Sequence, residues 1–223
     1  MGWFGKRAHR KRLKQKAQKG VDVVSACRMH MYDKVMESLS LRSEKVRAAE
    51  KIKEEIYRRS DAGEDRRILE IMAGDYDSLM SGIKISDETL DIIRVAYYAM
   101  IDLEVVVEQV MHLEWYKYII GTIPVKKIPD LINSEGNAGL REITRLANEI
   151  CQKIQDKMFA AIDDQEEAAR IRRRIQAVAE ERKGKSESSG VSALNRILAD
   201  RDRPEPKNVA NTTHQKADNV LKA

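Results

Sequence analysis

The first twenty residues hold the most concentrated set of chemically active side chains in this 223-residue sequence. They contain eight Lys and Arg residues and no Asp or Glu, and two large aromatic residues precede the cations. Basic side chains bind lipid phosphates, while Trp and Phe can enter the boundary between headgroups and acyl chains. We therefore expect a basic membrane-contacting arm over 1–20, with these contact residues: Trp3, Phe4, Lys6, Arg7, Arg10, Lys11, Arg12 and Lys14.

The same cations would also attract nucleic acid, and a flexible solubilising tail is a third interpretation of the arm. The whole chain has a net charge of +5, but outside the arm 33 basic residues stand against 36 acidic ones. The positive charge is therefore a property of the arm. Few aromatic residues lie among the cations beyond Trp3 and Phe4, which leaves little material for stacking on bases. Nucleic acid is accordingly the less favoured partner.

Residues that could perform catalysis or bind metal form no complete set. Glu108 and His112 are four residues apart, but a di-iron helical bundle needs a second Glu/His pair on a facing helix. Asp87, Glu88 and Asp91 could gather a metal ion, although their spacing suits the first turn of a helix better. No glycine-rich phosphate-binding loop is recognisable. We expect a protein that is not an enzyme and has no cofactor.

The cysteines and the apolar segments place the chain in a cellular context. Cys27 and Cys151 form no motif and suit two small buried side chains in a reducing cytosol. No apolar run of signal-peptide type follows the basic start. Charged residues interrupt the most apolar region, 92–120, whereas a membrane span needs about 20 largely uncharged residues. The sequence predicts a cytoplasmic protein that contacts membranes peripherally.

Composition predicts an all-α fold of long amphipathic helices. Aromatic residues make up 5% of the chain and there are four prolines, so the short strands and turns of a β-sandwich are not indicated, whereas charged residues reach 35%. Residues 21–60 lack Gly and Pro and predict one long helix, which ends at a turn over 61–65. Its apolar stripe has helical spacing: Tyr32, Val35, Leu39, Val46, Ala49, Ile52 and Ile56.

A short helical pattern follows over 68–80, and Gly74 and Gly82 weaken it. The next long helix is predicted to start at Ser86-Asp87-Glu88, where a capping residue is followed by acids, and to continue to about Ile120. Its apolar face is too wide for one neighbouring helix, which predicts contact with a second copy of the chain. Asp102, Glu104 and Glu108 would then meet Arg42, Arg47 or Arg58 of that copy. The expected self-association residues are Ile92, Val95, Ala99, Leu103, Val106 and Val110.

Turns over 121–129 and 134–137 precede a further amphipathic pattern that starts at Leu140 and continues to Val178. Within it, Arg170–Arg174 suggests a solvated basic face. Residues 184–190 have the composition of a linker, and the polar end after Pro204 suggests disorder, so we divide the chain into 1–20, 21–183 and 184–223. An apolar patch between these flexible parts would fold on a partner or on its own domain: Val191, Leu194, Ile197, Leu198 and Arg201.

This order of parts resembles the ESCRT-III superfamily, and most closely its archaeal CdvB branch. The resemblance is carried by the Met-Gly-Trp-Phe-Gly-Lys start, by the Ala99–Glu108 segment with its Leu-Glu pair, and by Gly139-Leu-Arg-Glu-Ile143. It implies a subunit that polymerises at the inner face of a membrane, with related subunits, and drives constriction or scission in cell division or vesicle formation. It also implies that the C-terminal patch meets the MIT domain of an AAA+ ATPase.

The sequence departs from that family in three places. Gly63, Gly74 and Gly82 interrupt the first hairpin more than the family pattern does. Arg170–Arg174 lies where an acidic segment is usual, and Leu194 and Arg196 do not have the spacing of the family's motif for the MIT domain. Two other classes therefore stay open. One is a helical coat or architectural protein on nucleic acid, and the other is a regulatory helical bundle of the PhoU type.

Overall fold

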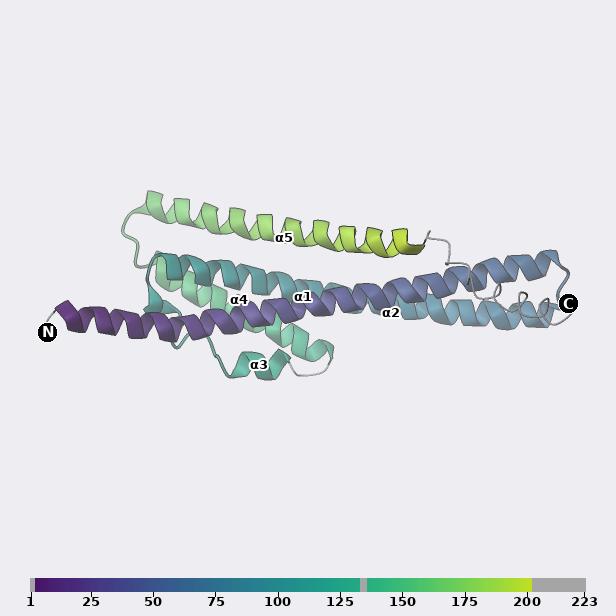
Figure 1. Ribbon diagram of the computed structural model, residues 1–223, viewed down its shortest axis with the longest axis horizontal. Coiled ribbons are helices and arrows are strands. Elements are labelled where there is room, and N and C mark those ends of the chain that lie inside the picture. Colours follow the sequence, from purple (N-terminus) through teal and green to yellow (C-terminus); the bar gives the residue numbers. More distant parts are fainter. Residues whose placement is uncertain (1–2, 133–135, 202–223) are drawn as a thin grey trace, which may run out of the picture. The chain divides into compact units, whose positions relative to one another are not determined.

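The computed structural model describes residues 3–132 and 136–201, with side chains from residue 7 to residue 188 inside those ranges. Every regular element in the described part is a helix, which confirms the all-α fold class. Two long helices, α1 (Trp3–Asp61) and α2 (Arg66–His112), run antiparallel as a hairpin, as Figure 1 shows. At 1.5 Å per residue, α1 is roughly 90 Å long.

The turn between α1 and α2 lies where the sequence predicts it, over 62–65. Gly63 has φ of +75°, a left-handed conformation that a residue without Cβ adopts at little cost. Asp65 then caps α2, because its side-chain carboxylate accepts a hydrogen bond of 2.8 Å from the Arg67 backbone N–H. A glycine that ends one helix and an aspartate that starts the next explain the sharp reversal of the chain.

α2 is continuous through the position where the sequence predicts a helix start, so that prediction is wrong. Ser86 and Asp87 lie in the middle of α2 and contact α1 instead of capping a helix. Lys45 donates a hydrogen bond of 2.8 Å to the Ser86 hydroxyl, and Arg42 forms an ion pair with Asp87. Gly74 costs an interior helix about 1 kcal/mol, which the packing of α2 on α1 outweighs.

α2 ends at His112, eight residues before the predicted end. Glu114 adopts a positive φ of 58°, and the Trp115 N–H donates to the Val110 carbonyl at 3.0 Å, which closes the helix. The chain then forms a short 3-10 helix η1 (Tyr116–Tyr118) and the short helix α3 (Lys127–Ile132). The apolar stretch after residue 112 is therefore a folded turn and not a continuation of α2.

The C-terminal helices are α4 (Asn137–Phe159) and α5 (Gln165–Arg201). The sequence predicts one uninterrupted pattern here, but the chain turns at 160–164 because the Asp164 carboxylate accepts the Glu166 N–H at 2.9 Å and starts a new helix. The predicted linker over 184–190 is helical and belongs to α5. The chain divides into two compact units, 1–185 and 186–223.

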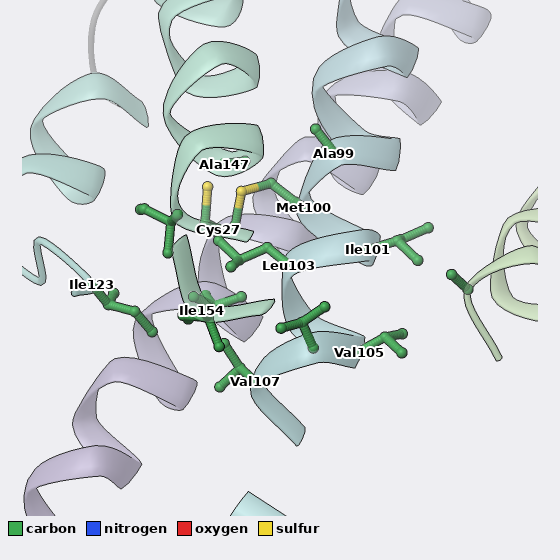
Figure 2. Packing of buried hydrophobic residues seen from close by; sticks show 14 of the residues in the cluster. Cys27, Ala99, Met100, Ile101, Leu103, Val105, Val107, Ile123, Ala147 and Ile154 are labelled. Atoms are coloured by element: carbon green, nitrogen blue, oxygen red, sulfur yellow. The ribbon is translucent and has the colours of Figure 1, made fainter. Parts of the chain in front are cut away.

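The core of the first unit lies where α1, α2 and α4 pack together. Cys27 and Leu103 are fully buried, and Figure 2 shows them together with Met100 and Ala147 between these three helices. Ile101 and Val105 point away from that group, although both are also buried. The other side of α2 is covered by the first half of α5, whose inner face is made of Ala168, Ile171, Ile175 and Ala179.

Candidate membrane-binding surface

The basic arm is the first part of α1 and not a separate segment. The helix is continuous from Trp3, and in Figure 1 it begins beyond the end of α2. The described cations predicted to contact a membrane are all exposed: Arg7, Arg10, Lys11, Arg12 and Lys14. Lys16 and Lys19 are exposed as well. The side chains of the other predicted contact residues, Trp3, Phe4 and Lys6, lie outside the described residues.

The inner face of this segment is apolar and holds it on the rest of the unit. Ala17 is fully buried, and Leu13 is half-buried against the core. Gly20 is also buried; a Cβ built at this position would lie 3.0 Å from Ile119 Cγ2 and 3.2 Å from Ile123 Cδ1. The glycine therefore allows a close contact between α1 and the turn after α2. This contact fixes the direction in which the arm leaves the unit.

The electrostatics of the arm favour an anionic partner. In the described structure, Arg10 forms an ion pair with Glu114 of the turn. The next carboxylate along α1 is Asp22, which accepts a hydrogen bond of 2.9 Å from Gln18. No acidic residue lies within the first twenty positions. The helix therefore presents its cations over its outer faces, and it can bind several phosphates at once.

The predicted self-association face is mostly buried inside the chain itself. Leu103, Val106 and Val110 have no exposed surface and Ala99 is 5% exposed, so these four residues pack against α1, α4 and α5 of their own chain. Ile92 is half-buried, and only Val95, at 55% exposure, faces solvent. The width of the apolar face was correctly identified, but its neighbours are further helices of the same chain.

The acids of α2 that were expected to meet a second copy are also satisfied within the chain. Glu104 is buried, and its Oε2 lies 2.7 Å from Arg28 Nε and 3.1 Å from Arg182 Nη1. The Arg28 N–H is not directed at the carboxylate, so this contact is an ion pair without a well-formed hydrogen bond. Arg182 also contacts Glu108, at 2.7 Å. One carboxylate thus joins α1, α2 and α5.

A second ion pair between α5 and α2 lies next to this one, with Lys183 Nζ 2.8 Å from Asp102 Oδ1. The hydrogen bond that Arg182 donates to the Glu108 carboxylate raises the pKa of Arg182 above its ordinary value. Burial opposes the charge of Lys183, but the hydrogen bond and the attraction of Asp102 outweigh it and raise the pKa of this amine. Both cations are therefore charged at neutral pH. Basic residues of α5 hold acidic residues of α2.

The arginines that were expected to pair with these acids have other neighbours. Arg42 pairs with Asp87, and Arg58 lies 2.6 Å from Glu55 of its own helix. The true partners, Arg28, Arg182 and Lys183, were missed by sequence reasoning. The sequence offers one indication of this pairing, because Arg182 and Lys183 directly follow the apolar pattern of α5. Arg28 has no comparable indication.

The remaining predicted features have mixed outcomes. Arg170–Arg174 is exposed apart from Ile171, as predicted, and the Arg172 guanidinium lies over the Phe159 ring at 4.3 Å. The backbone of the C-terminal patch is part of α5, but all its side chains lie outside the described residues: Val191, Leu194, Ile197, Leu198 and Arg201.

A groove of about 490 Å³ lies between α2, α4 and α5, and its lining includes Asp102, Cys151, Gln155 and Arg172. Burial raises the pKa of Cys151 to about 11, so the thiol is protonated at neutral pH. In the described part of the chain, no three His, Cys, Asp or Glu side chains come together as a metal site. Among the described helices, none is both long enough and apolar enough to cross a membrane.

Comparisons with known proteins add no relative to this description. No family model, no curated protein and no solved structure matches the chain.

Proposed function

We propose that this chain is a peripheral membrane protein that binds anionic bilayers through the start of α1 and remodels them as a polymer, in the manner of ESCRT-III. The observation that carries the proposal is the basic arm. Seven described Lys and Arg side chains are exposed there, and no acidic residue interrupts them. A rigid helix, joined to the folded unit through Gly20, presents this charge.

The expected binding energy is large and depends on salt. Each cation near an anionic lipid surface contributes about 1 kcal/mol, and the attraction falls off within a Debye length of about 10 Å at 0.1 M salt. Seven or eight such charges therefore give strong binding at low ionic strength and weak binding at high ionic strength. Aromatic residues at the start of the helix would add an apolar contribution that salt does not screen.

Assembly would use the part of the hairpin that the other helices leave uncovered. Ile71 and Ile85 of α2 are 67% and 63% exposed, and they share a seven-residue spacing with Ser78 and Ile92. Ile83, Leu90 and Tyr97 have the same seven-residue spacing on the buried side of α2, where Tyr97 contacts Tyr32 of α1. A second copy of the hairpin carries helices with this repeat and can pack against the outer stripe in the same way.

Vesicle flotation tests the lipid contact. The double variant Lys11→Glu/Lys14→Glu reverses two exposed charges of the arm and should abolish flotation with anionic vesicles at about 0.1 M salt. Lys51→Glu/Lys53→Glu is the matched control, because it reverses two exposed charges elsewhere on α1. The control should float like the unmodified chain. Equal flotation of both variants would contradict the proposal.

Electron microscopy of the chain with anionic vesicles tests the assembly. Filaments or coated tubules are expected for the unmodified chain, and Ile71→Asp/Ile85→Asp should remove them while leaving flotation intact. Ala73→Asp/Ser81→Asp adds the same charge at two exposed neighbouring positions and should retain them. An unmodified chain that binds vesicles but stays monomeric on them would leave a membrane adaptor in place of a remodelling polymer.

A further inference from the structure

The turn that follows α2 is a rigid structure beside the arm. Its backbone is held by a series of hydrogen bonds, among them Tyr118 N–H to the Trp115 carbonyl at 3.0 Å and Lys127 N–H to the Pro124 carbonyl at 2.9 Å. Tyr116, Ile119 and Ile123 point inward and are buried. These three anchors fix the turn on the unit, and they decide which of its side chains face outward.

The partly exposed side chains of the turn are aromatic and aliphatic, and Trp115, Tyr118 and Ile120 pack against the core with the rest of their surface. Trp115 and Tyr118 are half-buried and contact each other edge to face, with 5.7 Å between their ring centroids. Ile120 is half-buried and Val125 is 39% exposed. Trp and Tyr have an apolar body and a polar edge, and such residues are enriched where protein meets the lipid headgroup region.

The charge of the same turn is positive. Lys117 is exposed and lies over the Tyr118 ring at 4.9 Å, and Lys126 is exposed next to Val125. Lys127 pairs with Glu142. The one acidic residue between 113 and 127 is Glu114, and its ion pair with Arg10 both neutralises it and links the turn to the arm. Cations and aromatic groups therefore lie together next to the basic arm.

We propose that the turn Trp115–Lys126 is a second lipid-contacting element, which places its aromatic side chains in the headgroup region of an anionic bilayer while the arm binds the surrounding phosphates. This inference rests on the membrane function proposed for the arm and names a further contact for it. The close approach of Gly20 to Ile119 and Ile123 holds the two elements in one orientation. Charge complementarity and the interfacial type of the side chains identify an anionic lipid surface as the partner.

Tryptophan fluorescence tests this contact directly, because the chain has two tryptophans. In Trp3→Phe, Trp115 is the only tryptophan, so excitation at a wavelength that tyrosine does not absorb reports on Trp115 alone, and the arm keeps an aromatic residue. Binding to anionic vesicles should shift its emission to shorter wavelength, and brominated acyl chains should quench it. Trp115→Phe leaves Trp3 as the emitter and reports on the arm alone. A vesicle-bound Trp3→Phe chain whose emission neither shifts nor is quenched would overturn the inference and leave the arm's function intact.

A charge reversal gives a second readout that does not disturb the core. Lys126→Glu changes the charge by two units and should weaken vesicle affinity about 30-fold, since about 1 kcal/mol is expected for each unit of charge. Lys84→Glu, at an exposed position of α2 away from the turn, changes the net charge equally and should weaken affinity much less. Equal losses for the two variants would overturn the inference. Failure of the unmodified chain to bind anionic vesicles would overturn both this inference and the proposed function.

Discussion

The two ends of the α1–α2 hairpin are built from the same two helices but are packed in different ways. In the part that we call the bundle, residues 13–35 of α1 and 90–112 of α2 share one apolar core with α3 and α4, and apolar side chains from the first half of α5 join the same core. α2 has fourteen buried residues, and thirteen of them lie in this part. In the distal hairpin, residues 36–89, the buried side chains are Ser43, Ala49 and Ile83. Stability should therefore reside mainly in the bundle.

The contacts between the helices differ in kind as well. In the distal hairpin, polar contacts between the helices accompany a thinner apolar seam: Lys45 donates to the Gly82 carbonyl at 3.2 Å, and Arg42 pairs with Asp87. Such pairs contribute little energy, about 0–1 kcal/mol when exposed, but they distinguish one register of two helices from another. The bundle holds the fold together, and the distal hairpin keeps its register while leaving apolar residues such as Ile71 exposed.

Thiol reactivity should show the largest difference between the two parts. Cys27 is fully buried in the bundle, and burial raises its pKa to about 12, so at pH 8 the reactive thiolate is scarce and the thiol is inaccessible. In a Cys151→Ser background, Cys27 should react with a thiol reagent at least about 10³ times more slowly than a cysteine introduced by Ile85→Cys. Both should react equally in denaturant. If the two cysteines react in buffer at rates within tenfold of each other, the proposed difference in packing between the bundle and the distal hairpin is wrong.

Truncation of apolar side chains should show the next largest effect. Leu103→Ala removes a fully buried side chain of the bundle and should lower the free energy of unfolding by about 2–5 kcal/mol. Val95→Ala removes a side chain that is 55% exposed on the same helix and should change it by less than about 0.5 kcal/mol. Urea denaturation followed by circular dichroism measures both. Similar losses would show that the exposed face is already covered.

Neutralising the buried Glu104 carboxylate, which pairs with Arg182 of α5, should have a smaller effect on the free energy of unfolding. Glu104→Gln removes the carboxylate that Arg28 and Arg182 share, and we expect a loss of about 1–3 kcal/mol because both arginines are partly screened by solvent. Hydrogen exchange of the α5 backbone between residues 165 and 185 should accelerate at the same time. Glu88→Gln changes an exposed acid and serves as the control. Unchanged exchange in α5 would show that apolar packing alone holds this helix.

Much of the fold could be predicted from the sequence. The helical spacing of apolar residues and the shortage of Pro and aromatic residues indicated long helices, and Gly63 with Asp65 marked the hairpin turn. The start of α2 was misplaced because Ser86 and Asp87 have the residue types of a helix cap. A local pattern does not reveal that their partners are Lys45 and Arg42, about forty residues away.

The candidate site was predicted in part for a similar reason. Charge is a local property, so the exposed cations of the arm, such as Lys11 and Lys14, were correctly placed on the surface. Burial depends on which elements pack together, and the sequence does not show that α4 and α5 cover the face containing Leu103 and Val106. The turn at Trp115 was not predicted, because its apolar residues continue the helical pattern of the segment before it.

A direct competition between vesicles and DNA tests the central claim, that the basic end of α1 serves a membrane. The chain is mixed with anionic vesicles and duplex DNA at equal phosphate concentration and equal salt, and the vesicles are then floated. Both surfaces attract the cations of the arm, but a bilayer can also take up apolar groups such as Trp3 and Phe4. We predict that most of the chain floats with the vesicles, and that raising the salt releases it from DNA first. A chain that stays with the DNA while the vesicles float without it would contradict the account.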